Sequence, residues 1–212
     1  MSDIQEFTPE AVEAYFTRAS GDYVFARWGR PIAPVVFGVS EDSLAVIKGS
    51  IEAAVAIAGA EVAETDAELG SNLMMFFFSD WKELLDVPNM GEMIPDLEMR
   101  VQMLMDRNAH QYRAFRFDDE GAIKACFTFV RMGGAMDDVP ADVIALSQAT
   151  QALLLWSDTV FTQDSPLALT EAGTVIRPDV ANVLRASYDP ILPRAARDAS
   201  HALRLYARLI AD

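Results

Sequence analysis

The strongest constraint on the fold of this chain is the run at residues 72–78 (NLMMFFF), which is apolar at every position after its first residue. A continuous apolar run of this length is typical of a strand buried on both faces, and it is far shorter than the roughly 20 residues that a membrane-spanning helix needs. We therefore expect a central strand here. We also expect a single domain (1–212), because a chain of this size buries roughly 70% of its unfolded surface without cross-links.

Capping residues, turn residues and apolar periodicity divide the rest of the chain into further elements. Helices are indicated where a cap or a proline precedes apolar residues spaced by three and four, and strands where aromatic and β-branched residues alternate. The predicted strands are 23–28, 34–38, 112–117 and 123–131, and the predicted helices are 9–18, 43–58, 95–107, 139–156, 178–188 and 194–210. The segments 80–92 and 157–177 are predicted to be irregular. This pattern predicts an α+β fold, with a small mixed or antiparallel sheet and packed helices.

The charge balance bears on the partners of the protein. The chain carries 17 Lys and Arg against 32 Asp and Glu, a formal net charge of −15. Binding to a nucleic-acid backbone needs an excess of basic residues, and an acidic surface is repelled by anionic membranes. We therefore expect no nucleic acid partner and no membrane insertion. An acidic decoy that mimics nucleic acid is an alternative, and it requires carboxylates spaced like phosphates on one face.

The start of the chain and its cysteine content bear on localisation. The first residues contain no basic segment followed by an apolar one, so we see no signal peptide. The single cysteine, Cys126, permits no internal disulfide, which fits a reducing compartment. We therefore expect a cytoplasmic protein.

Residues that usually carry catalysis or bind metals are scarce. There are two histidines, His110 and His201, far apart in the sequence. A zinc hydrolase usually has three protein ligands, and its familiar motif places two histidines four residues apart on a helix. Cys126 lies in an apolar strand and is expected to be a buried, inert thiol. No glycine-rich phosphate loop and no nucleophile motif occurs. We expect no catalytic residues, no metal and no cofactor.

Two other groups of residues are candidates for a surface that meets a partner. Methionines cluster within 90–105, where thioethers fill an irregular core, line an adaptable binding surface or, less often, bind Cu(I). Basic residues of the predicted helix 194–210 recur at steps of four, three and four on one face, which either borders solvent on a docked helix or contacts a partner. The candidate partner surface comprises Met90, Met93, Met99, Met103, Arg197, His201, Arg204 and Arg208.

Short words spread over most of the chain follow a recognisable order. They are 26–28 (ARW) with Pro31, the strand at 72–78, 151–153 (QAL), Asp158, 159–161 (TVF), 184–190 (LRASYDP) and 192–193 (LP). In this order the chain resembles a bacterial family of unknown function that is distantly zincin-like, which means similar to metallopeptidases. The resemblance implies a zincin-like fold and some relatives that are exported or lipid-anchored.

The resemblance also indicates where a zinc site would lie. The ligand positions of the helical motif fall on Ser147 and Gln151, the general-base position on Gln148, and the region of the third ligand on Asp158. A hydroxyl or an amide is not a usual zinc ligand, and an amide is not a base at neutral pH. The resemblance therefore implies a degenerate metallopeptidase fold without its metal site. It leaves a cleft between the 72–78 strand and the helix of Ser147, which either binds a peptide by strand addition or is filled by the methionine-rich segment.

These observations predict a non-catalytic protein-binding or assembly protein on a degenerate metallopeptidase-like fold, whose partner is another protein. The alternatives are a hydrolase that uses carboxylates alone, which needs a pocket lined by converging carboxylates, and the acidic decoy. With 32 Asp and Glu in the chain, some pair of carboxylates will always look plausible, so the sequence does not favour the hydrolase. Oligomeric state is left open.

Overall fold

A four-stranded mixed sheet forms the centre of the protein in the computed structural model, which describes residues 8–211. The strand order is β2-β3-β5-β4, where the strands are β2 (Pro34–Phe37), β3 (Leu73–Phe78), β4 (Gln111–Phe117) and β5 (Ile123–Arg131). β3 pairs in parallel with both β2 and β5, whereas β4 pairs antiparallel with β5 and forms one edge. The prediction of a central strand at 72–78 is therefore confirmed.

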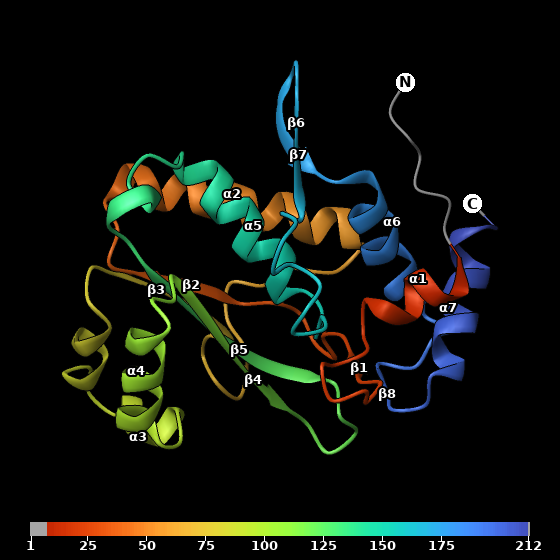
Figure 1. Ribbon diagram of the computed structural model, residues 1–212, viewed down its shortest axis with the longest axis horizontal. Helices are drawn as coiled ribbons and strands as arrows, with labels where there is room; N and C mark the ends of the chain where they lie inside the picture. The colour runs from red at the N-terminus through yellow and green to blue at the C-terminus, as the bar shows by residue number, and fades with distance from the viewer. Residues whose placement is uncertain (1–7, 212) are drawn as a thin grey trace.

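Two long helices cover one face of this sheet (Figure 1). They are α2 (Glu41–Ala58) and α5 (Ala141–Ala152), which pack against each other. The α2 helix begins where the Ser40 hydroxyl accepts a hydrogen bond from the Ser43 N–H, and it ends at Gly59 in the left-handed region, where glycine is favoured. Its buried side chains join the larger of two hydrophobic clusters. This face positions α5 beside the edge strand β4.

The opposite face of the sheet is covered by a segment that we call the methionine-rich lobe, residues 81–106. Its elements are the 3₁₀ helix η1 (Trp81–Leu85), α3 (Met90–Met93) and α4 (Leu97–Asp106). Trp81 and Met90 are fully buried in the second hydrophobic cluster, together with phenylalanines of β3 and β5. The lobe therefore has a core of its own on that face.

Most of the remaining elements gather at one end of the molecule (Figure 1). There α1 (Pro9–Ala14) and α6 (Pro178–Ser187) each contact α7 (Ser200–Leu209), and β1 (Phe25–Ala26) pairs antiparallel with β8 (Ala195–Ala196). The hairpin of β6 (Leu167–Thr170) and β7 (Gly173–Ile176) projects from the body, and a short 3₁₀ turn, η2 (Gly134–Met136), precedes α5.

The α+β class and the mixed sheet are confirmed. The segment 80–92, predicted to be irregular, contains η1 and the start of α3. The helices predicted at 9–18 and 139–156 end earlier, at Ala14 and Ala152.

Three further predictions differ because of strand pairing. The strand predicted at 23–28 is regular only over Phe25–Ala26. The last helix begins at Ser200 rather than at 194, because Ala195–Ala196 pair with that strand instead of joining the helix. The segment 157–177 contains the β6–β7 hairpin. In each case tertiary pairing decides the conformation of a short segment whose local preference is weak.

Within the described residues, no helix is both long enough and apolar enough to cross a membrane.

Candidate functional site

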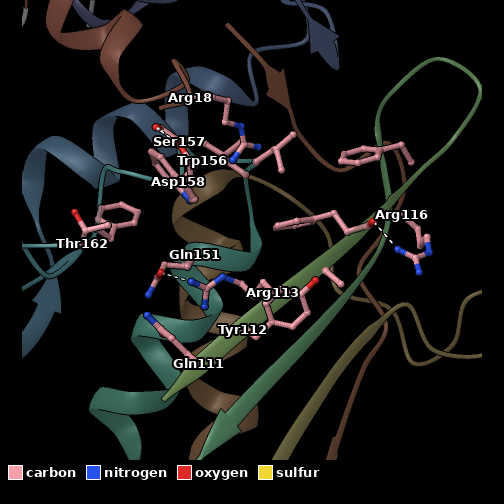
Figure 2. A pocket seen from close by; sticks show the side chains of 16 residues that line it. Arg18, Gln111, Tyr112, Arg113, Arg116, Gln151, Trp156, Ser157, Asp158 and Thr162 are labelled. Carbon is pink, nitrogen blue, oxygen red and sulfur yellow. Dashed lines mark hydrogen bonds between the residues drawn. The ribbon is translucent and has the colours of Figure 1, made fainter. Parts of the chain in front are cut away.

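A cleft of about 550 Å³ lies between strand β4 and the end of helix α5 with the segment that follows it. Residues 111–117 form one wall, and Gln151, residues 154–158, Phe161 and Thr162 form the other, with Arg18 at the rim (Figure 2). The cleft was predicted between the 72–78 strand and the helix of Ser147. That prediction was wrong in its strand, because β3 lies in the middle of the sheet and β4 forms the edge beside α5.

The backbone of β4 is open along this cleft. The N–H of Arg131 donates to the carbonyl of His110, so the two residues form a hydrogen-bonded pair at the start of the β4–β5 ladder. In an antiparallel ladder such pairs alternate with pairs whose backbone groups point away from the partner strand. The backbone groups of Gln111, Arg113 and Phe115 therefore point to the outer edge. Within residues 8–211, β5 is the one strand that pairs with β4.

The side chain of Arg113 spans the gap between β4 and α5. Its Nη1 donates to Oε1 of Gln148 at 2.6 Å. Its Nη2 donates to Oε1 of Gln151 (Figure 2). Gln148 in turn donates to Oε1 of Gln111 at 2.7 Å, and Gln151 donates to Oγ of Ser147 at 3.0 Å. These five side chains form one polar network, which we call the amide network.

The amide network brings together three of the residues that the sequence singled out. Gln148 and Gln151 are buried and Ser147 is partly buried, on the turns of α5 that face β4. Asp158, the fourth predicted position, does not join them. Its carboxylate is exposed, lines another part of the cleft and accepts a hydrogen bond from the N–H of Ala19 at 2.9 Å.

The charge of Arg113 has no acidic partner nearby. Among residues 8–211 no carboxylate lies within 4.0 Å of its guanidinium, whose two hydrogen-bond partners are neutral amides. Burial lowers the pKa of Arg113 to about 10, so the group is still protonated at neutral pH. Removal of this charge from water is therefore only partly compensated within the chain.

The two other arginines of the cleft are arranged differently. Arg18 lies at the rim on the side of Trp156 and Asp158 (Figure 2). The Arg116 side chain leaves β4 on the opposite face, where its guanidinium donates to the carbonyl of Met93 and lies 5.8 Å from the centre of the Phe127 ring. The charges that face the cleft are thus Arg18, Arg113 and Asp158, a positive excess in a chain of net charge −15.

The methionines of the candidate partner surface do not form one surface. Met90 is buried beneath the lobe, so its assignment to a surface was wrong. Met93 and Met103 are partly buried, while Met99 is 66% exposed. Met90 and Met93 pack in the lobe core, which is the alternative that the sequence left open.

The basic residues predicted on one face of the C-terminal helix are also separated. Arg197 precedes α7, and His201 is buried, where its Nδ1 lies 2.7 Å from the Tyr23 hydroxyl. Their assignment to an exposed helical stripe was wrong, because α7 is shorter than expected and its first turn packs against the body. Arg204 is exposed, and Arg208 forms an ion pair with Asp189 at 3.4 Å.

Cys126 and the acidic residues contribute no further site to the described part of the chain. The Cys126 thiol is buried, and burial raises its pKa to about 11, so it is protonated at neutral pH. His110 is partly buried at the start of β4, 3.5 Å from an Arg131 guanidinium nitrogen. Between residues 8 and 211, no group of three or more His, Cys, Asp and Glu is arranged to hold a metal ion.

The sequence patterns did not identify Arg113 and Gln111 as site residues. One signal could have identified Arg113, because the alternation in 112–117 places it on the same face of the strand as Phe115, which packs against the main core. A basic residue on a core-facing position needs partners, and the glutamines of α5 supply them.

Comparisons of the chain with protein-family models, with curated proteins and with solved structures found no match. The zincin-like resemblance therefore stays a prediction.

Proposed function

We propose that this protein binds an extended peptide segment of another protein along the open edge of β4, and that it does so without catalysing a reaction on that segment. The observation that carries the proposal is the coincidence of a strand edge, unpaired within residues 8–211, with a cleft of about 550 Å³. A strand that adds to a sheet edge gains main-chain hydrogen bonds, and pockets beside the edge select its side chains.

The backbone of β4 supports this mode of binding. The outward N–H and C=O groups of Gln111 and Arg113 lie along the wall of the cleft. The next outward carbonyl, that of Phe115, already accepts a hydrogen bond from the Arg116 guanidinium at 3.1 Å. The edge available for pairing therefore begins at residue 111 and is limited near residue 115. A peptide that pairs here has a short register of a few residues.

The chemistry of the cleft walls supports a binding role in place of a catalytic one. The positions that the resemblance assigns to zinc ligands and general base are Ser147, Gln151 and Gln148, and all three are engaged in the amide network. Amides held by a guanidinium position a neighbouring strand but do not transfer protons at neutral pH. The location of these residues beside an edge strand is also what supports the finer proposal of a degenerate metallopeptidase-like fold.

The proposal is tested by selection of displayed random peptides on the immobilised protein. A proline at residue 111 removes one outward N–H, and proline is tolerated at the first residue of an edge strand. We expect Gln111→Pro to lose at least about tenfold in affinity for the selected peptides, a loss of about 1.4 kcal/mol. The matched variant Gln111→Ala removes the same side chain but keeps the N–H, and it should lose much less.

A second measurement separates strand addition from other modes of binding. The selected peptide is synthesised with single N-methyl groups at successive positions, which removes one N–H at a time. Strand addition predicts that binding falls at alternate positions, because only alternate N–H groups of the peptide face β4. Equal affinity of all the methylated peptides, or failure of the selection to enrich any peptide, would overturn the proposed function.

A further inference from the structure

We infer that the ligand of the β4 cleft is anchored by a carboxylate, from an acidic side chain or a free C-terminus, which binds the Arg113 guanidinium. This inference rests on the proposed function and specifies the chemistry of the peptide. It assigns to Arg113 a role in selecting the ligand, beyond its contacts with the glutamines of α5.

The unused donors of Arg113 are the first support. A guanidinium has five N–H donors in a planar fork. The hydrogen bonds to Gln148 and Gln151 use one on each Nη, so three donors remain within the described structure. Paired N–H groups of arginine match the two oxygens of a carboxylate, and such charge-assisted bonds are about twice as strong as neutral ones.

The position of Arg113 in the strand is the second support. Its backbone groups point to the open edge while its side chain lies on the α5 face. A peptide strand paired with β4 places every second side chain on that same face. Side chains directly opposite in antiparallel strands have Cβ atoms roughly 4.5–5.5 Å apart, and oppositely charged residues stabilise such a pair. The peptide residue that faces Arg113 is therefore expected to be acidic.

The surrounding charge is the third support. The one carboxylate that lines the cleft, Asp158, is exposed and accepts a backbone N–H from Ala19. Gln111, Gln148 and Gln151 surround the guanidinium with neutral dipoles. The rest of the protein is strongly acidic. An incoming carboxylate is thus disfavoured over most of the surface and favoured at this cleft, which gives specificity by repulsion as well as attraction.

A purely structural role for Arg113 makes a different prediction. In that case the guanidinium only holds α5 against β4, and its substitution lowers stability without changing which peptides bind. The discriminating quantity is therefore the ratio of affinities for two peptides that differ by one charge. This ratio is insensitive to a general weakening of the cleft, because both peptides lose the same amount.

The test uses three fluorescent seven-residue peptides of alternating threonine and valine, measured by fluorescence anisotropy. The first has a central glutamate and an amidated C-terminus, the second has glutamine instead, and the third has glutamine with a free C-terminus. We expect the first or the third to bind the native protein at least about tenfold more tightly than the second. In Arg113→Gln all three should agree within about twofold. The control Arg107→Gln removes an exposed arginine at the end of α4 that does not line the cleft, and it should keep the native preference.

Each outcome decides the inference. A preference for the first peptide identifies an acidic side chain as the source of the carboxylate, and a preference for the third identifies a C-terminus. Equal binding of all three to the native protein, a preference that survives in Arg113→Gln, or no binding of any of them overturns the inference. The proposed function is judged separately by the displayed library. If neutral peptides are enriched there and bind more weakly to Gln111→Pro, strand addition is supported even where the carboxylate anchor is not.

Discussion

Two arginines of this protein, Arg177 and Arg113, have opposite electrostatic environments. Arg177 donates to both oxygens of Asp179, at 3.0 and 2.5 Å, and the Tyr15 hydroxyl completes the group at 2.6 Å. The hydrogen bonds that Arg177 donates to Asp179 raise the pKa of Arg177. At Arg113 the partners are amides, and burial lowers the pKa to about 10.

Arg177 belongs to a closed ion pair, in which the two charges balance each other. Arg113 is an open cation, in which no carboxylate of the described chain neutralises the charge. At the first site every charge is balanced within the chain, so the pair links the start of α6 to α1 and has little to offer a ligand. At the second site the cation is held in place but its charge is not neutralised. A fixed, uncompensated charge in a cleft is typical of a binding site, because the missing counter-charge can be supplied by the ligand.

The largest expected effect comes from breaking the closed pair. Asp179→Asn leaves Arg177 partly buried without its counter-charge and should lower the free energy of unfolding by about 2–3 kcal/mol. Denaturation in urea measures this. The control Asp119→Asn, at an exposed turn position, should change stability by less than about 0.5 kcal/mol. Equal effects of the two substitutions would show that Asp179 does not stabilise the protein as the counter-charge of Arg177.

The second effect concerns His201, another buried ionisable group with a neutral partner. Burial lowers its pKa to about 4, and its Nε2 has no hydrogen-bond partner in the described structure. Because folding lowers this pKa, the folded protein has its full stability above a pH of about 6.5, the pKa of the histidine in the unfolded chain. Stability falls as the pH decreases from there toward the pKa in the folded protein. Between pH 7 and pH 5 the protein should lose on the order of 1–2 kcal/mol.

The variant His201→Gln isolates this contribution. Glutamine does not titrate, so the urea midpoint of the variant should change less between pH 7 and pH 5 than that of the native protein. Identical pH dependence of the two proteins would show that His201 does not cause the loss.

The third effect converts the open cation into a closed pair. Gln151→Glu places a carboxylate where an amide already contacts Arg113, and the Ser147 hydroxyl can donate to it. We expect a gain in the free energy of unfolding of about 1 kcal/mol. The variant should also lose the preference for carboxylate peptides, because the counter-charge is now internal. Urea denaturation and the anisotropy assay measure the two results, and a preserved preference would contradict the explanation.

The smallest effect is expected for Arg113→Gln. Removal of a partly buried charge that has only neutral partners relieves its desolvation, which offsets the loss of two hydrogen bonds. We expect the free energy of unfolding to change by less than about 1 kcal/mol, as measured in urea. A loss as large as that of Asp179→Asn would indicate that the guanidinium is mainly a structural clamp.

Local patterns predicted most of the fold. The apolar run 72–78, the alternation on both sides of the turn at 118–122, and the spacing of three and four in α2 each report on one element and its immediate environment. The β6–β7 hairpin and the β1–β8 pair were missed, because strands of two to four residues carry too few alternating positions to be recognised. Their conformation depends on pairing partners that sequence patterns do not identify.

The candidate site was predictable only in part. Gln148 and Gln151 were singled out through a resemblance to another family, and they lie in the cleft. Arg113 was not singled out, because its importance depends on which helix covers β4, and Gln148 is 35 residues away in the sequence. The parallel pairing of β2, β3 and β5 was equally hidden, since a buried strand has the same apolar pattern in either direction.

The strand order also has a consequence for the order in which the protein assembles. β4 and β5 are neighbours in sequence and close a local hairpin, whereas β2 and β3 pair only across α2, and β3 and β5 only across the methionine-rich lobe. Contacts between distant residues form slowly, because a long loop must close before they contribute. The hairpin can therefore form early, with the Arg113 side chain hydrated, and α5 docks onto it later. During synthesis β4 precedes α5, so its edge is exposed before the helix docks and is open to premature pairing with another chain.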